Sequence, residues 1–238
     1  MEEIADISLM QRVVNNSFKR EFEVLGEYEK SNLPSTVISS DAFGAYNIFT
    51  GELEKYAIRE TEISKLITLT EQHKNNQYCW LLSNAFEKFE KFINTTYNLM
   101  SNSDKSKRDL RKVLTYFTDN LPYLKKHEKN NKSGIHLKIA ILYIEKLRHA
   151  IVHSQGKLDD VEIFVSKTIK DSGISNNKKD HEEFIKQYIS NNQVVIFETP
   201  IGNKSAFPRY HDVYTHLVSY LIGYAGLVNK AVNLHKNV

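Results

Sequence analysis

The chain has 238 residues, enough for one elaborated domain or for one domain with a small companion. The hydrophobic share of 41% is typical of a globular protein, and the charges nearly balance to a net +3. This balance does not by itself indicate a nucleic-acid partner, although a local basic patch can still bind phosphate.

The cysteine content and the first residues bear on metal binding and location. A single cysteine, Cys79, excludes an internal disulfide, and no cysteine or histidine spacing is typical of a zinc site. We therefore expect no metal and no cofactor. The first six residues are acidic where a secretion signal is positively charged. No apolar run reaches membrane-spanning length, including residues 213–232. The expected location is the cytoplasm, without a membrane partner.

Residues 1–75 are predicted to form an N-terminal helical elaboration. Apolar residues at helical spacing predict a helix over 4–25, and a proline marks a loop over 31–40. Residues from 45 to 53 and onward suggest a short hairpin. A second helix is predicted over 58–70.

Residues 76–238 carry the strongest helical signals. Over 77–100 the gaps between apolar residues alternate between three and four, which gives one broad stripe. Further helices are predicted over 110–121 and about 135–155, and a charged loop over 125–134 separates them. A final helix is predicted from about 208 to 234.

The residue pattern changes near residue 157, which predicts an insertion before the last helix. The β-branched and aromatic runs 161–165 and 194–197 indicate strands, separated by the polar stretch 171–180. The predicted fold class is therefore mainly α, with a small mixed α/β insertion at about 157–205.

The predicted third helix ends in an arginine and two histidines. On a helical wheel Arg148 lies at the edge of the apolar arc, whereas His149 and His153 lie one turn apart on a more polar side. A guanidinium at the margin of a core is costly unless an acceptor satisfies it. Arg148 therefore needs either an internal carboxylate or an external anion.

The histidine at the end of this helix suits proton transfer. His153 lies in the last predicted turn, where the helix dipole favours a protonated imidazole. Histidine also exchanges protons near neutral pH. An arginine that holds phosphate oxygens and a histidine that moves a proton together suit a phosphodiester. The spacing alone is weak evidence, since nine histidines and seven arginines give such a pair roughly once by chance.

The run Arg148-His149-Ala150-Ile151-Val152-His153 resembles the signature of the HEPN superfamily: an arginine, a polar residue, a few mostly apolar residues and a histidine. The stretch from Trp80 to Phe89 is similar to the opening helix of that fold. The resemblance covers roughly residues 76–156 and the final helix. It implies an antiparallel helical bundle that forms homodimers, in which two motif copies face each other across one cleft.

The resemblance also implies a function and roles for single residues. Many members cleave RNA without metal through the ribose 2′-hydroxyl, in toxin–antitoxin or antiviral defence systems. Arg148 and His153 then take the catalytic roles, and His149 a supporting one. The family often adds a polar residue from its first bundle helix, for which Glu87 is the first candidate and Asn84 the second. The implied partners are an RNA substrate, a second copy, and an antitoxin or regulatory protein.

One position departs from a subset of the family. These members have a tyrosine two positions after the motif histidine, which a partner nucleotidyltransferase modifies. Here that position is Gln155, which argues against that form of neutralisation.

Two alternatives to an enzyme stay open at this point. One is a non-catalytic module that binds RNA, a nucleotide or a protein. The other is a structural protein in which Arg148 pairs internally, for instance with Glu87. Two basic runs either steer RNA or are ordinary solvated segments. They comprise Lys105, Lys107, Arg108, Arg111 and Lys112, and then Lys125, Lys126, Lys129 and Lys132.

Overall fold

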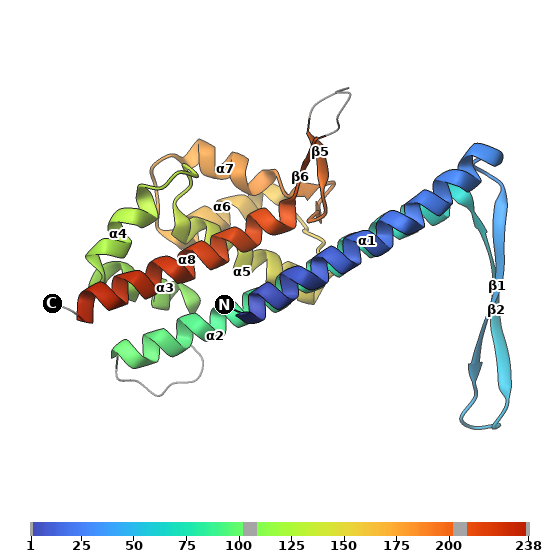
Figure 1. Cartoon of the computed structure of the whole chain (residues 1–238), viewed down its shortest axis with the longest axis horizontal. Coiled ribbons are helices and arrows are strands. Elements are labelled where there is room, and N and C mark those ends of the chain that lie inside the picture. Colours follow the sequence, from blue (N-terminus) through green and yellow to red (C-terminus); the bar gives the residue numbers. More distant parts are fainter. Residues whose placement is uncertain (1, 102–108, 202–208, 237–238) are drawn as a thin grey trace. The chain divides into compact units, whose positions relative to one another are not determined.

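The computed structural model describes residues 2–101, 109–201 and 209–236, in which eight helices and six strands follow one another (Figure 1). The predicted mainly helical fold class is confirmed. In chain order the elements are α1 (Glu2–Ser31), β1 (Val37–Tyr46), β2 (Leu53–Glu62), α2 (Ile63–Ser101), α3 (Leu110–Asn120), α4 (Pro122–Lys129), α5 (Leu137–Ser154), α6 (Val161–Ser172), α7 (Lys178–Lys186), β3 (Ile189–Ser190), β4 (Gln193–Val194), β5 (Thr199–Ile201), β6 (Arg209–His211) and α8 (Val213–Lys236).

The chain divides into two compact units. The larger comprises Met1–Gln11 and Asn76–Val238, and the smaller comprises Arg12–Asn75. Both α1 and α2 continue through these divisions. The prediction of two separate helices over 58–70 and 77–100 is therefore wrong, because α2 runs from Ile63 to Ser101 without a break.

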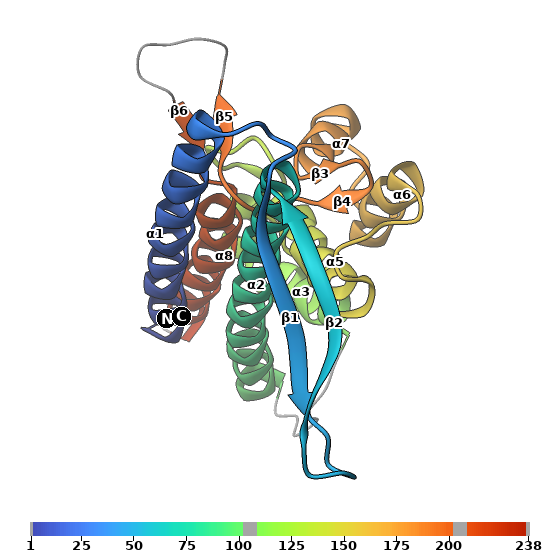
Figure 2. The ribbon, with the colours of Figure 1, turned by 90° about the vertical axis from the view of Figure 1, so that its right-hand side faces the viewer.

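The smaller unit contains a β-hairpin whose two strands each have ten residues (Figure 2). The strands pair antiparallel and leave a turn between Tyr46 and Leu53. Gly51 has a φ of 75°, and its N–H donates to the Asn47 carbonyl at 2.9 Å. The prediction of a hairpin with a second strand from residue 53 is confirmed, but the first strand begins at Val37, so the last part of the predicted loop over 31–40 is strand. Residues 58–62 are strand and not helix, since pairing with β1 overrides their helical spacing.

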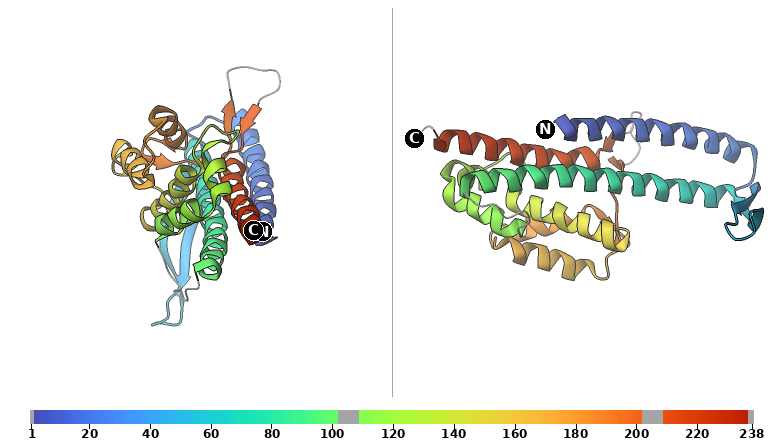
Figure 3. Two further views of the ribbon diagram at one scale, coloured as in Figure 1. Left: turned by 90° about the vertical axis from the view of Figure 1, so that its left-hand side faces the viewer. Right: turned by 90° about the horizontal axis from the view of Figure 1, so that it is seen from below.

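The core of the larger unit lies where α2, α5 and α8 meet. Figure 3 shows α2 and α8 running in the same direction and α5 running opposite to both. Phe86 and Phe89 of α2 are at most 1% exposed, and Phe89 contacts the ring of Tyr224 in α8 at 6.2 Å between centroids. The predicted apolar stripe of α2 is thus confirmed as core at these two positions.

The end of α5 is fixed by two residues in the left-handed conformation. Gln155 has a φ of 52° and Gly156 a φ of 79°. The Gly156 N–H donates to the Ala150 carbonyl at 3.0 Å, which satisfies one of the free carbonyls of the last turn. The helix predicted over about 135–155 thus ends at Ser154, and His153 lies in its last turn, as predicted.

A fully buried carboxylate joins three helices of the larger unit. Glu128 of α4 is 0% exposed and accepts hydrogen bonds from Tyr224 at 2.8 Å and from Thr118 at 2.9 Å. The predicted loop over 125–134 is wrong in its first part, because α4 extends to Lys129. Pro122 begins this helix, where a missing N–H costs nothing.

The insertion is more helical than predicted. Residues 161–165 begin α6 and do not form a strand. Asp160 caps the helix by accepting from the Ile163 N–H at 2.9 Å, and Val165 and Ile169 bury one face at helical spacing. The run 194–197 contributes only its first residue to a strand, β4.

Two sequence-based predictions fall outside the described ranges. They are the predicted start of the last helix near Pro208 and three basic residues: Lys105, Lys107 and Arg108. The described helix α8 begins at Val213. Among the described residues, no helix has both the length and the apolar character needed to span a membrane.

Candidate functional site

The predicted catalytic arginine forms an ion pair with the first candidate from α2. Arg148 Nη2 lies 2.9 Å from Glu87 Oε1. The Arg148 side chain is 28% exposed and that of Glu87 is 51% exposed. Arg148 Nε is buried and has no hydrogen-bond partner among the described residues. The guanidinium therefore has an internal carboxylate and still retains donor capacity.

The two motif histidines contact each other. The rings of His149 and His153 lie 4.3 Å apart between centroids, with 49° between their planes. Both residues are exposed. Neighbouring atoms partly desolvate the exposed His149 ring, which lowers its pKa, and the nearby His153 and Arg148 lower it further. The lowered pKa favours the neutral imidazole of His149, the form that can accept a proton.

The structure brings four of the five predicted site residues together as two pairs. Arg148 meets Glu87, and His149 meets His153. Asn84 is half-buried on α2, three positions before Glu87, and makes no hydrogen bond with the other four in the described chain. Five positions separate Arg148 from His153, which turns the two side chains about 140° apart around α5. One chain thus presents the arginine and the histidine on different sides of the helix.

A cavity of about 650 Å³ lies beside His149, between α5 and α6. Neither Arg148 nor His153 lines it, nor do they line two further cavities of the larger unit. The Arg148–Glu87 pair is nevertheless partly open to solvent, since the two side chains are 28% and 51% exposed. The cavity is lined by Glu145, Lys146, His149, Ala150, Ser154, Lys157, Leu158, Asp159, Asp160, Ile163, Phe164 and Lys167.

Sequence reasoning missed Glu145, which faces this cavity one turn before His149. Burial raises the pKa of its carboxyl to about 7, and the Glu90 carboxylate on α2 adds to the increase. Next to it, Lys146 Nζ lies 2.6 Å from Asp171 Oδ2, an ion pair that joins α5 to α6. The only signal in the sequence was the four-residue spacing between Glu145 and His149, which places both on one helical face.

The chain was compared with known proteins, and neither protein-family models, curated proteins nor solved structures gave a match. Within the described ranges, no group of three or more histidine, cysteine, aspartate or glutamate side chains is placed to hold a metal ion. Cys79 is buried, and burial raises the pKa of its thiol to about 12. What the site offers is a positioned guanidinium, two adjacent imidazoles and a carboxyl that titrates near neutrality.

Proposed function

We propose that this protein is a metal-independent RNA endonuclease of the HEPN type. The observation that supports it is the Arg148–Glu87 ion pair, which holds a partly exposed guanidinium at the end of α5, beside the turn that carries His153. A guanidinium held in this way can bind a phosphate through donors that Glu87 does not use.

The proposed reaction uses arginine for charge and histidine for protons. A neutral imidazole of His153 removes the proton from the ribose 2′-hydroxyl. The 2′-oxygen attacks phosphorus, and the bond from phosphorus to the 5′-oxygen breaks. A protonated imidazole donates a proton to the leaving oxygen, so the products are a 2′,3′-cyclic phosphate and a 5′-hydroxyl. Arg148 stabilises the negative charge that develops on the phosphoryl oxygens.

A homodimer would complete this site. Arg148 and His153 diverge around α5, so a single chain does not direct both at one phosphate from the same side. Two copies facing each other supply two imidazoles, one as base and one as acid, together with two guanidinium groups. In this proposal the protein acts in the cytoplasm in antiviral defence or a toxin–antitoxin pair, and an antitoxin or regulatory protein restrains it.

The test is cleavage of total RNA and of tRNA in the presence of EDTA. We expect cleavage by the wild type, and a loss of about 100-fold or more for Arg148→Ala and His153→Ala. The matched control is His235→Ala, because His235 is also an exposed histidine in the last turn of a helix. Circular dichroism checks that each variant keeps its helix content. Cleavage that survives in His153→Ala contradicts the proposed role.

A second candidate is a non-catalytic module that binds RNA, a nucleotide or a protein. It is favoured by the same ion pair, since Glu87 already satisfies part of Arg148 without any external anion. A partly exposed ion pair contributes only about 0–1 kcal/mol, so Arg148→Ala should barely change the free energy of unfolding. Binding of RNA without any turnover supports this candidate. A loss of more than about 3 kcal/mol instead indicates a purely structural arginine.

A further inference from the structure

The segment that contains α4 and the following loop concentrates positive charge. Residues 122–134 hold four lysines and one glutamate, a formal +3 that equals the net charge of the whole chain. All four lysines are exposed, and none forms an ion pair with another described residue. The glutamate, Glu128, is fully buried and points away from solvent. The lysines are Lys125, Lys126, Lys129 and Lys132.

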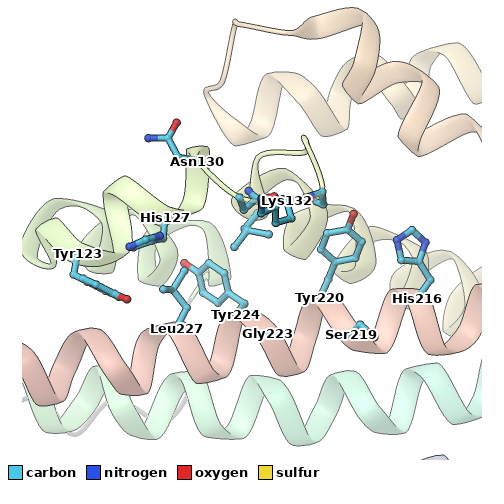
Figure 4. Close-up of a pocket in the computed structure, with 13 residues that line it drawn as sticks. Tyr123, His127, Asn130, Lys132, His216, Ser219, Tyr220, Gly223, Tyr224 and Leu227 are labelled. Atoms are coloured by element: carbon cyan, nitrogen blue, oxygen red, sulfur yellow. Dashed lines mark hydrogen bonds between the residues drawn. The ribbon is translucent and has the colours of Figure 1, made fainter.

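A cavity of about 540 Å³ opens beside these lysines, between α4 and α8. Figure 4 shows aromatic rings from both helices in this space, with Tyr123 and His127 on α4 and Tyr220 and Tyr224 on α8. Lys132 is also part of the lining. A volume of this size suits a small planar ligand or a single nucleotide.

Five of the thirteen lining residues carry a ring, three of them tyrosines and two histidines. The rings of Tyr123 and His127 lie 4.4 Å apart between centroids. Tyr224 is fully buried and its hydroxyl donates to Glu128, so a ligand would reach the half-buried rings of Tyr123 and His127 instead. At Gly223 of α8 an added Cβ would meet nothing within 4 Å, so the absent side chain leaves the cavity floor open.

We propose that this cavity binds an unpaired nucleobase whose neighbouring phosphates are held by the lysines of residues 122–134. Aromatic surfaces bind bases by stacking, and lysines bind phosphates by charge. The source of the base is either single-stranded RNA or a free nucleotide. RNA as the source rests on the proposed ribonuclease function.

The cavity is placed so that an RNA strand bound there can continue to Arg148. Leu137, at the start of α5, lines the cavity, and Arg148 lies eleven residues further along the same helix. This separation is about 16 Å along the helix axis. A few nucleotides of an extended strand cover that distance, so one RNA segment can place a base in the cavity and a phosphate at Arg148.

The decisive variant fills the cavity without changing any charge. Gly223→Leu adds a side chain to the cavity lining, whereas Gly226→Leu makes the same change on the same helix at a position that does not line it. Neither added Cβ meets an atom within 4 Å, so both variants are expected to fold. Both are made in the full chain carrying His153→Ala, which prevents cleavage during the measurement.

Binding is measured by fluorescence anisotropy with a labelled ten-nucleotide single-stranded RNA, and by calorimetry with AMP. We expect Gly223→Leu to weaken RNA binding about tenfold or more, and Gly226→Leu to leave it unchanged. Lys132→Gln should also lower the salt dependence of binding, because one phosphate contact is lost. If Gly223→Leu weakens AMP binding to the same degree, the ligand is a free nucleotide. If Gly223→Leu weakens only RNA binding, the ligand is the RNA polymer.

The inference is overturned if Gly223→Leu binds each probe, RNA and AMP, with the same affinity as Gly226→Leu. It is also overturned if neither probe binds. The ribonuclease proposal is judged separately, by cleavage with His153 intact. If Gly223→Leu cleaves short RNA with an unchanged KM, the cavity proposal fails and the enzyme stands. If RNA binds in a Gly223-dependent manner but no protein cleaves it, the enzyme fails and the cavity stands.

Discussion

Replacing Glu145 by glutamine should remove a pH dependence of stability that the structure assigns to this carboxyl. Burial at the α5–α6 cavity raises its pKa to about 7 from an ordinary value of 4.5, with a further contribution from Glu90. The folded state therefore binds more protons than the unfolded state between these two values, and stability falls as pH rises through this window. The stabilising effect is complete below pH 4.5 and lost above about pH 7.

The size of this effect follows from the separation of the two pKa values. At 1.36 kcal/mol per pKa unit the full separation corresponds to about 3 kcal/mol. Glu145 borders a cavity that opens to solvent, so we expect screening to reduce the effect to about 1–2 kcal/mol. Glutamine has nearly the same shape and no charge. The stability difference between Glu145→Gln and the wild type should grow by that amount from pH 4.5 to pH 8.

The assay is urea denaturation followed by circular dichroism at several pH values, with two-state behaviour checked because the chain has two units. The other titratable groups at the cavity, including His149 and Lys146, occur in both proteins and largely cancel in the difference. Glu90→Gln is the matched control. It should reduce the loss of stability with rising pH, since it removes the carboxylate charge that helps to raise the pKa of Glu145. Parallel stability profiles for wild type and Glu145→Gln would refute the reasoning.

Two further predictions concern stability. Glu128→Ala leaves the buried Tyr224 hydroxyl without its acceptor, while the Thr118 hydroxyl keeps the Leu114 carbonyl, and should cost about 2–4 kcal/mol in urea denaturation. Glu128→Gln keeps an acceptor for Tyr224 and should cost clearly less, and equal losses contradict the hydrogen-bond account. Gly156→Ala, at a φ of 79°, should lose about 1 kcal/mol, and Gly226→Ala, within α8 and with open space around it, should gain up to about 1 kcal/mol. Changes of the same sign at both glycines would exclude backbone conformation as the cause.

The sequence located the helix that carries the motif because the necessary signals are local. Apolar residues recur along one face of α5, and Gly156 ends the helix through its own backbone conformation. The edge position of Arg148 on the wheel also indicated that it needs an acceptor. That the acceptor is Glu87, a candidate chosen from a distant helix, was established only by the approach of α2 to α5.

The errors in element type share one cause. Residues 161–165 are β-branched and apolar in a run too short to distinguish a strand from a helix, and the Asp160 cap together with burial of one face decided for α6. Residues 58–62 show helical spacing, yet they pair with β1. In both cases the tertiary environment outweighed the weak preference of a few residues.

The amino-acid sequence by itself determined the helical class, the apolar faces of the long helices and the last turn that holds His153, since these depend on residues within a few positions of each other. Only the tertiary structure decided the raised pKa of Glu145 and the cavity between α4 and α8. Tyr123 and Tyr220 are nearly a hundred positions apart, and the environment of Glu145 depends on α2 and α6. Burial and charge proximity are properties of the packed chain, so no local pattern records them.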